Sequence, residues 1–435
     1  MDPRAIHALN RFGLGRRRDE AVPGNPEAWL AAQLDGSDPA LALPASTVAE
    51  GLMAWREDLL RGNIGPGAAR AIMAADTKTL LDYAVETASP FRERLVWFWA
   101  NHFTVSLRRG AVQAVAQAYL REAIRPHVTG CFVDMLGAVM RHPAMLFYLD
   151  NAQSAGPDSL AARRVRAGAA RNPAGLNENL ARECLELHTL TPASGYTQAD
   201  VVALAQVLTG WSVAVREDPP RALFRPGMHQ PGPKTVLGHA CPEGPEGLDS
   251  VLAFLAAHPA TLHNLAAKLV RHFVADTPPP AAVARVAAVL ADSGGDLRQA
   301  ALAVVALPEA WTPLAKLRGP ADYVLAVVRA LDLPAAQRPR LREVMAALGQ
   351  PVMNAPLPNG WPDTAMDWAA PEAMLRRIDW AYAVAGRGAA QDPMAMAERA
   401  LGPLLKQDTR DEMMRAGSRR EALALLFASP EFQRR

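Results

Sequence analysis

The stretch NENLARECLELHTL, residues 177–190, has the pattern of a helix with two unlike faces. At about 100° per residue, its polar side chains fall on one side, with Glu178 at the edge. We call this side the charged stripe: Asn179, Arg182, Glu183 and Glu186. The opposite side holds Leu180, Ala181, Cys184, Leu187 and His188. The stretch therefore predicts a helix that packs on one side and presents carboxylates around an arginine on the other.

A second helix is predicted over residues 91–106, and it carries large side chains on two faces. One face holds Phe91, Leu95, Phe98, Trp99, His102 and Val105, and the other holds Arg94, Trp97 and Asn101. Large groups on two faces are typical of a helix that other elements surround. We expect this helix at the centre of the molecule, with His102 among aromatic rings.

Helical patterns fill most of the remaining chain, and strand signals are confined to residues 211–238. Short β-prone runs at 212–215, 222–224 and 235–237 are separated by prolines, as expected for short strands between turns. The sequence therefore predicts an all-α, bundle-like fold with a small antiparallel β flap over residues 211–238.

The length of 435 residues allows two or three domains or one large helical one. We expect a single helical domain over residues 1–435, with a possible division into a main body, 1–330, and a C-terminal helical extension, 331–435. Half of the residues are hydrophobic and 21% are charged, as in ordinary globular proteins. The net charge of +2 gives no reason to expect binding to nucleic acid.

Three cysteines lie far apart in the chain, at positions 131, 184 and 241. Their number and spacing argue against a disulfide framework and against a zinc site built from thiolates. The N-terminal residues show no apolar stretch typical of a signal peptide, and no apolar run is long enough for a membrane span. We expect a cytoplasmic protein; the alternative is export together with a partner that carries a signal.

Read together, several stretches of the chain resemble the bacterial domain-of-unknown-function 1800 family. They are RFGLG (11–15), FWANHF (98–103), HPAML (142–146), LDN (149–151), residues 177–190, YTQADV (196–201), LTGW (208–211), HQPGPKTVLG (229–238), KL (268–269) and PNGWP (358–362). The resemblance covers most of the chain in order. It implies no reaction, but members of the family often carry export signals and occur beside a sulfatase-like partner family.

The chain departs from the family pattern at two places. Thr191 and Pro192 stand where the family usually has a glycine after the stretch 177–190, and Ala100 stands where a histidine is often found. The second departure removes a candidate metal ligand beside His102, which makes a histidine-rich metal site less expected.

The charged stripe has two interpretations. If it faces an enclosed cleft, two close carboxylates raise the pKa of one of them while an arginine keeps the other ionised. Glu183 would then be a general acid or base, Glu186 the second carboxylate, and Arg182 the group that sets their ionisation or binds an anion. If it faces water, the stripe is a hydrated helix face with a Glu178–Arg182 pair of little energetic weight.

His102 and His188 both lie on apolar helix faces, where a histidine is usually a core residue with satisfied ring nitrogens. If their helices pack together, the two rings and a glutamate resemble a catalytic metal site with an open position. The charged stripe, however, points away from His188 on the same helix. A divalent metal is therefore possible but not favoured, and acid–base or structural roles for both histidines are preferred.

Further candidates for substrate binding surround these two helices. Asn101 and Asn179 lie beside the proposed cleft, and Asp150 and Asn151 precede a polar, arginine-rich stretch that runs to about residue 175. Trp211 packs in the core or stacks on a ligand. The segment from His229 to Gly238, which includes Lys234, is not a phosphate-binding loop of the Walker type, and we expect a lid or a docking flap there.

Two hypotheses about function follow. The first is an enzyme of hydrolytic or transfer chemistry, with a polar cleft between the helix of Asn101 and His102 and the helix of Arg182, Glu183 and Glu186. The second is a non-enzymatic accessory protein that binds a sulfatase-like partner. A buried and fully paired polar network would leave the same residues in the sequence.

Overall fold

The computed structural model describes residues 2–62, 67–168 and 175–435. Helices dominate this part of the chain, and the named strands form two short antiparallel hairpins. The prediction of an all-α fold with a small β flap is confirmed. No helix of the described residues has the length and apolar character that crossing a membrane requires.

The helices of the first half are the following: α1 (Pro3–Arg11), α2 (Pro26–Ala32), α3 (Val48–Arg61), α4 (Ala68–Glu86), α5 (Pro90–His102), α6 (Gly110–Gln113), α7 (Ala116–Tyr119), α8 (Phe132–Arg141), α9 (Pro143–Tyr148), α10 (Leu160–Arg166), α11 (Asn179–Glu183) and α12 (Gln198–Leu208). Two π-helical turns, η2 (Leu120–Ile124) and η5 (Cys184–His188), continue α7 and α11. Four of these helices, α1, α2, α5 and α9, begin at a proline, which fits the first helical position because its missing N–H would have no partner there.

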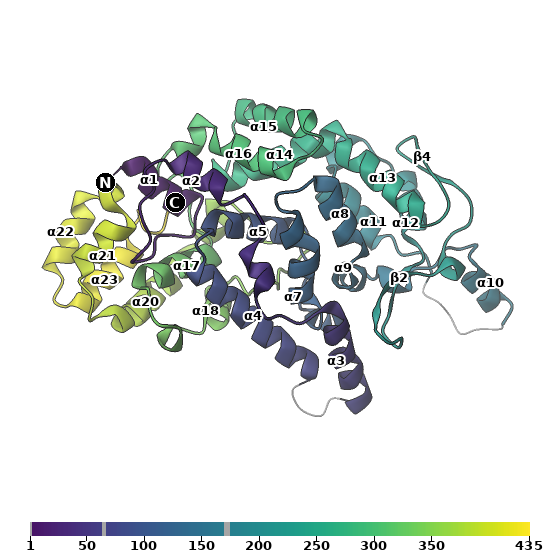
Figure 1. The fold of residues 1–435 in the computed structure, drawn as a ribbon, viewed down its shortest axis with the longest axis horizontal. Coiled ribbons are helices and arrows are strands. Elements are labelled where there is room, and N and C mark those ends of the chain that lie inside the picture. Colours follow the sequence, from purple (N-terminus) through teal and green to yellow (C-terminus); the bar gives the residue numbers. More distant parts are fainter. Residues whose placement is uncertain (1, 63–66, 169–174) are drawn as a thin grey trace.

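The second half contains α13 (Pro245–Ala257), α14 (Pro259–Phe273), α15 (Pro280–Asp292), α16 (Leu297–Val305), α17 (Pro320–Leu331), α18 (Leu341–Ala347), α19 (Ala365–Trp368), α20 (Pro371–Ala385), α21 (Pro393–Ala400), α22 (Gln407–Arg415) and α23 (Arg419–Ala428). Figure 1 shows α20 to α23 at one end of the molecule, and α10 and α12 with the strands toward the other.

Two clusters of buried apolar side chains form the core. The larger cluster draws its residues from Ala8 to Ala310. The smaller one combines residues 321–432 with Leu14 and three residues near the end of α4. Helix α17 contributes nearly all of its apolar residues to the smaller cluster. The division of the chain between residues 330 and 331 stays a prediction.

Helix α5 lies in the middle of the molecule (Figure 1), and ten of its 13 residues are buried. His102 contacts the rings of Trp99 and Phe103, with centroid distances of 5.4 and 4.4 Å. The expected position of His102 among aromatic side chains is therefore what the structure shows. Phe103 ends the helix, so the predicted extension to residue 106 is wrong.

The stretch 177–190 is helical, but it does not keep the α-helical period. Helix α11 passes into the π-helix η5, and Thr189 N donates to Cys184 O, five residues back, at 3.0 Å. The wider turn changes which side chains face the core: Leu185 is buried, while Leu187 is half-buried. The predicted apolar face is therefore wrong at Leu187, because the α-helical angle does not hold past residue 183.

The β flap consists of two hairpins. Strand β1 (Trp211–Ala214) pairs with β2 (Arg221–Phe224), and β3 (Lys234–Val236) pairs with β4 (His239–Cys241). The second hairpin turns at Leu237 and Gly238, both with positive φ. The flap thus extends three residues past the predicted end at residue 238.

The polar, arginine-rich stretch that follows Asn151 and runs to about residue 175 has the pattern of a loop. The described part contains a 3-10 turn over Asn151–Gln153 and the short helix α10, which the sequence analysis did not predict. Ser159 caps α10, because its side chain accepts a hydrogen bond from Ala162 N at 3.2 Å. Residues 169–174 of this stretch lie outside the described residues.

Candidate functional site

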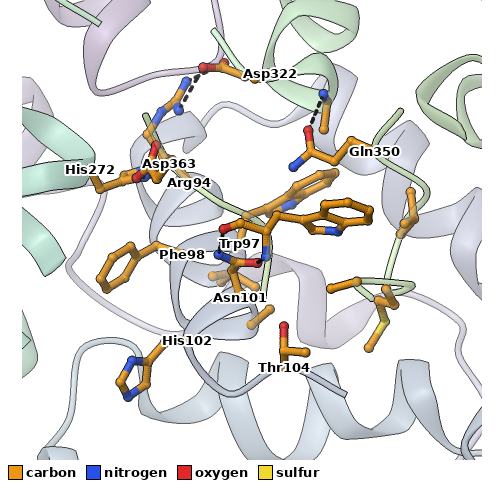
Figure 2. Close-up of a pocket in the computed structure, with 18 of the residues that line it drawn as sticks. Arg94, Trp97, Phe98, Asn101, His102, Thr104, His272, Asp322, Gln350 and Asp363 are labelled. Carbon is orange, nitrogen blue, oxygen red and sulfur yellow. Dashed lines mark hydrogen bonds and ion pairs between the residues drawn. The ribbon is translucent and has the colours of Figure 1, made fainter. Parts of the chain in front are cut away.

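A pocket of about 350 Å³ lies beside α5, a volume in the range of small-molecule sites. Its walls come from α4, α5, α14, the start of α17 and the loop between α18 and α19. Figure 2 shows Trp97, Phe98 and Asn101 of α5 in this pocket, with His272 and Asp363 on one side and Gln350 on the other. Segments far apart in the sequence therefore build the pocket together.

Helix α14 contributes three basic side chains to the pocket wall: Lys268, Arg271 and His272. Their spacing of i, i+3 and i+4 places them on one face of the helix. The opposite side of α14 carries the buried residues Ala266, Val270 and Phe273, and the helix packs against α15 and α16. Packing of the apolar face thus turns the basic face toward the pocket.

The loop with the sequence PNGWPD, residues 358–363, closes another side of the pocket. Asn101 holds it through two hydrogen bonds: Nδ2 donates to Trp361 O at 2.9 Å, and Oδ1 accepts from Trp361 N at 2.7 Å. Gly360 has a φ of 77°, and a β-carbon there would lie 2.5 Å from Asn101 O. The loop can approach α5 this closely only with glycine at that position.

His272 and Asp363 form a hydrogen-bonded pair at the pocket. His272 Nδ1 lies 2.6 Å from Asp363 Oδ2, so Nδ1 carries the proton and Nε2 keeps its lone pair. Nε2 is buried and has no hydrogen-bond partner among the described residues. Burial lowers the pKa of His272 to about 4, against the opposing effect of Asp363. The ring is therefore neutral at pH 7, with an unoccupied basic nitrogen.

Asp363 stays ionised although it is partly buried, with a side chain that is 31% exposed. Burial raises its pKa, but His272, Lys316 and Arg435 lower it more, to about 2. Lys316 Nζ donates to Asp363 O at 2.6 Å and also pairs with Asp276. A fixed carboxylate behind a neutral imidazole orients the ring and stabilises the imidazolium once a proton arrives.

A second buried carboxylate, Asp322, lies among arginines. Arg94 Nη2 contacts Asp322 Oδ1 at 2.7 Å, and Arg435 Nε lies 2.9 Å from Asp322 Oδ2. Arg318 is a third cation, at 3.9 Å. Burial opposes ionisation of Asp322, but Arg94, Arg435 and Arg318 hold the pKa of this carboxyl well below its usual range. This cluster joins α5, α17 and the C-terminal residue Arg435 in the wall of the pocket.

The two histidines predicted from the sequence, His102 and His188, lie near Lys268. His102 Nε2 donates to His188 O at 3.1 Å, which leaves His102 Nδ1 as an acceptor for Lys268 Nζ, also at 3.1 Å. Lys268 Nζ donates in addition to Leu187 O at 2.8 Å. Burial, and then Arg271, lower the pKa of Lys268 to about 8. His102 Nδ1 and Leu187 O thus hold Lys268 at the pocket. His188 contributes through its backbone carbonyl, which orients the ring of His102.

The charged stripe lies outside the pocket. None of its residues is among the side chains that line the cavity. Arg182 pairs with Glu178 at 3.2 Å and with Glu186 at 3.6 Å, and the exposed fractions of these side chains are 39%, 34% and 28%. Burial, and then Glu186, raise the pKa of Glu183. The stripe is a half-exposed ion-paired face, and its catalytic role stays a prediction that the pocket does not support.

The residues expected at the rim of a cleft have structural contacts. Asp150 pairs with Arg109 at 2.7 Å, and its side chain is 41% exposed. Asn151 is buried, and its Nδ2 donates to Leu208 O and Trp211 O, both at 3.2 Å. Trp211 packs against Phe224 and lies under the guanidinium of Arg141. Asn151 and Trp211 join the β flap to the helical body, and none of the three residues lines the pocket.

His229 and Lys234 form a separate cluster within the flap. His229 Nδ1 lies 2.7 Å from Thr209 O, and His229 Nε2 lies 2.9 Å from Lys234 Nζ. Lys234 also donates to Gln230 O. Burial lowers the pKa of both His229 and Lys234. Both side chains bind backbone carbonyls, so the cluster stabilises the fold of the second hairpin. Neither residue lines the pocket.

A metal site shared by His102, His188 and a glutamate would need these side chains to meet at one point. The rings of His102 and His188 lie side by side, with centroids 6.2 Å apart. Within residues 2–62, 67–168 and 175–435, no three His, Cys, Asp or Glu side chains gather as a metal site requires. The carboxylates of the charged stripe do not join the two histidines.

Of the predicted site residues, the structure places Asn101 and His102 at the pocket. Sequence reasoning missed Lys268, Arg271, His272 and Asp363. The spacing of the three basic residues on one helix was a visible signal, but one that surface helices also show. No pattern in the sequence links His272 with Asp363, which are 91 positions apart.

Comparison with known proteins is informative at the level of the family. The sequence model of a family described as "Protein of unknown function (DUF1800)" matches residues 7–434, nearly the whole chain. No curated protein and no solved structure matches. Any statement about function therefore depends on the geometry of the pocket.

Proposed function

We propose, for a chain that belongs to the DUF1800 family of proteins of unknown function, that the pocket beside α5 is the active site of a hydrolytic enzyme. The observation that carries the proposal is the His272–Asp363 pair, at 2.6 Å, with His272 Nε2 buried and without a partner in the described structure. A buried acceptor without a partner costs about 1–3 kcal/mol. A proton donor from water or substrate would remove that cost.

The pair has the parts of a general base. His272 Nε2 takes a proton from a water molecule, and the oxygen of that water forms a bond to the carbonyl carbon or phosphorus of an ester. The bond to the leaving oxygen breaks, and the imidazolium returns its proton to that oxygen. Asp363 stabilises the imidazolium between these two steps and keeps the ring oriented.

The apolar walls of the pocket support this chemistry. Trp97, Phe98, Trp361 and Trp368 line it, and Phe98 packs against the ring of His272 with centroids 5.3 Å apart. A site with few waters strengthens the interaction between charges and protects the reacting groups from bulk solvent. The walls also offer surface to an apolar part of the substrate.

An accessory protein that binds a sulfatase-like partner is the second candidate. The observation that favours it is the charged stripe, where Arg182 and Gln198 both bind Glu178 at a half-exposed face away from the pocket. Ion-paired side chains without a cavity fit a docking or packing role better than catalysis. In this role the predicted residues Glu183 and Glu186 would contact a protein.

Turnover of simple esters separates the two candidates. The full chain is mixed with a panel of carboxylic and phosphoric esters, and product release is compared with that of His272→Gln. Loss of a general base lowers the rate by about 10²–10⁴. Arg70→Gln is the control, since Arg70 is exposed on α4 and does not line the pocket. Equal rates for the chain and for His272→Gln would leave the accessory role as the better account.

A further inference from the structure

Lys268 and Arg271 are two cations at the pocket without a carboxylate partner. Lys268 Nζ binds Leu187 O and His102 Nδ1, both uncharged acceptors. Arg271 makes no ion pair or side-chain hydrogen bond within the described residues. The two lie one turn apart on α14, and their repulsion contributes to the low pKa of Lys268. Such a pair is electrostatically incomplete.

The carboxylates of the pocket cannot complete it, because each already has other partners. Glu93 binds Arg125 through both oxygens, at 2.8 Å each. Asp322 is held by Arg94 and Arg435, and Asp363 by His272 and Lys316. These three are the carboxylates among the residues that line the pocket in the described chain. A bound anion would supply the missing negative charge.

We infer that Lys268 and Arg271 bind the anionic oxygen group, a carboxylate or a phosphate, of a small organic molecule whose apolar part contacts Trp97, Trp361 and Trp368. This inference deepens the proposed function, on which it rests, by naming the class of substrate. Guanidinium and ammonium groups bind such oxygens through short, charge-assisted hydrogen bonds. Lys268 uses two of its three N–H donors on the protein and keeps one for the ligand.

The hydrogen bonds from Lys268 to His102 Nδ1 and Leu187 O fix the ammonium group before a ligand binds. His102 is therefore a positioning residue, and its own orientation comes from His188 O. Preorganised donors lose less conformational entropy on binding than free side chains do. An anion at Lys268 and Arg271 also lies on the same face of α14 as His272. Its charge favours the protonated imidazole and so raises the basicity of His272 toward the pH at which the enzyme works.

Isothermal titration calorimetry on the full chain tests this inference with three probes: benzoate, phenyl phosphate and the neutral benzyl alcohol. We expect one or both anions to bind, at least about tenfold more tightly than benzyl alcohol. Preference for benzoate or for phenyl phosphate identifies the anionic group. Anions that bind no more tightly than benzyl alcohol, or not at all, overturn the inference.

Two variants locate the site. Arg271→Gln and Lys268→Met should each weaken anion binding about tenfold or more and leave benzyl alcohol unaffected. Arg271 carries the test if Lys268→Met fails to fold, because the guanidinium of Arg271 holds no other described residue. Lys406→Met, at an exposed lysine, and Arg70→Gln are the matched controls. Anion binding that is unchanged in Arg271→Gln contradicts the inference.

The inference and the proposed function can fail separately. Anion binding that depends on Arg271, in a protein whose ester turnover is indifferent to His272→Gln, supports the inference and refutes the catalytic pair. Ester turnover that depends on His272 but has the same KM in Arg271→Gln supports the pair and refutes the inference.

Discussion

His272 and Asp363 lie 91 positions apart in the sequence, and their side chains meet at 2.6 Å. Both residues are fixed by other parts of the fold: α14 carries His272, and Lys316 and Arg435 lie beside Asp363. The pair leaves His272 Nε2 without a partner in the described chain. The fold thus sets the orientation of the imidazole, and that orientation leaves Nε2 as the proposed general base.

The first prediction concerns the protonation of this pair. At pH 7, ¹⁵N spectra of the histidine side chains should show His272 neutral, with the proton on Nδ1 and none on Nε2. The reason is the carboxylate at Nδ1 together with a pKa lowered to about 4. Asp363→Asn removes the carboxylate and should change the resonances of this ring. A positively charged His272 at pH 7 would contradict the assignment.

Asp322→Asn is expected to destabilise the protein strongly. The substitution leaves Arg94, Arg318 and Arg435 buried around a neutral amide, and the loss of one partner from a buried ion pair costs about 3–5 kcal/mol. Urea unfolding measures the effect on the free energy of unfolding. Asp249→Asn is the matched control, because Asp249 pairs with Arg141 at the surface and is 69% exposed; exposed pairs contribute about 0–1 kcal/mol. Equal effects of the two substitutions would count against the buried cluster.

Gly360→Ala should loosen the loop that closes the pocket. The new β-carbon would lie 2.5 Å from Asn101 O, at a residue with a φ of 77°, and strain of this kind costs about 1–3 kcal/mol. Hydrogen exchange over residues 357–363 should become faster, and the melting temperature should fall. Gly24→Ala serves as control, since a β-carbon at Gly24 meets nothing within 4 Å. Unchanged exchange in Gly360→Ala would show that the Asn101 contacts do not hold the loop.

Acid should destabilise the protein through His142. Burial lowers the pKa of His142 to about 3, while the unfolded chain takes up this proton near pH 6.5. The unfolded state therefore binds more protons between these values, and stability falls as the pH drops from 6.5 toward 3, by about 1.4 kcal/mol per pH unit for one such group.

His142→Asn isolates this contribution. Asparagine also caps helices well, so the hydrogen bond from Ala144 N to residue 142 can be kept while the titrating ring is removed. The free energy of unfolding is measured from pH 7 to 4. Its slope against pH should be smaller in the variant, by the amount that corresponds to the uptake of one proton on unfolding. His142→Ala, which loses the cap as well, should be less stable than His142→Asn throughout. A slope unchanged from that of the parent chain would refute the buried neutral state of His142.

Glu183→Gln is expected to raise the stability at pH 7. Burial and Glu186 raise the pKa of Glu183, so the ionised form is less favourable in the folded chain. Stability from this group is therefore lost as the pH rises from the ordinary pKa of a glutamate through the raised pKa of the folded state. A neutral amide avoids that loss. Thermal unfolding at pH 7 and at pH 4 measures it, and the gain should be smaller at pH 4. A lower melting temperature at pH 7 would indicate that Glu183 binds a cation or a partner.

The sequence allowed the helical class, the central position of residues 91–102 and the region of the β flap to be predicted. Each of these depends on local patterns: periodic apolar residues, prolines at helix starts, and β-branched runs between turns. The π-helix η5 could not be predicted, because it depends on how Thr189 and Lys268 bind carbonyls of that turn. The wider turn moved Leu185 into the core.

The candidate site was predicted only in part, for a physical reason. Asn101 and His102 were recognisable because polar groups stood out on an aromatic helix. His272, Asp363 and Arg271 became candidates only when the fold brought three distant segments to one pocket. The charged stripe was the most conspicuous polar pattern in the sequence, yet spacing along a helix does not tell which face meets a cavity.

The most direct test of the central claim is the separation of kcat and KM for an ester that carries an anionic group. The account predicts that His272→Gln lowers kcat about 10²–10⁴-fold with little change in KM, and that Arg271→Gln mainly raises KM. Arg70→Gln should match the parent chain in both constants. If no ester of the panel is hydrolysed, or if His272→Gln retains the parent kcat, the pocket is not a hydrolytic active site.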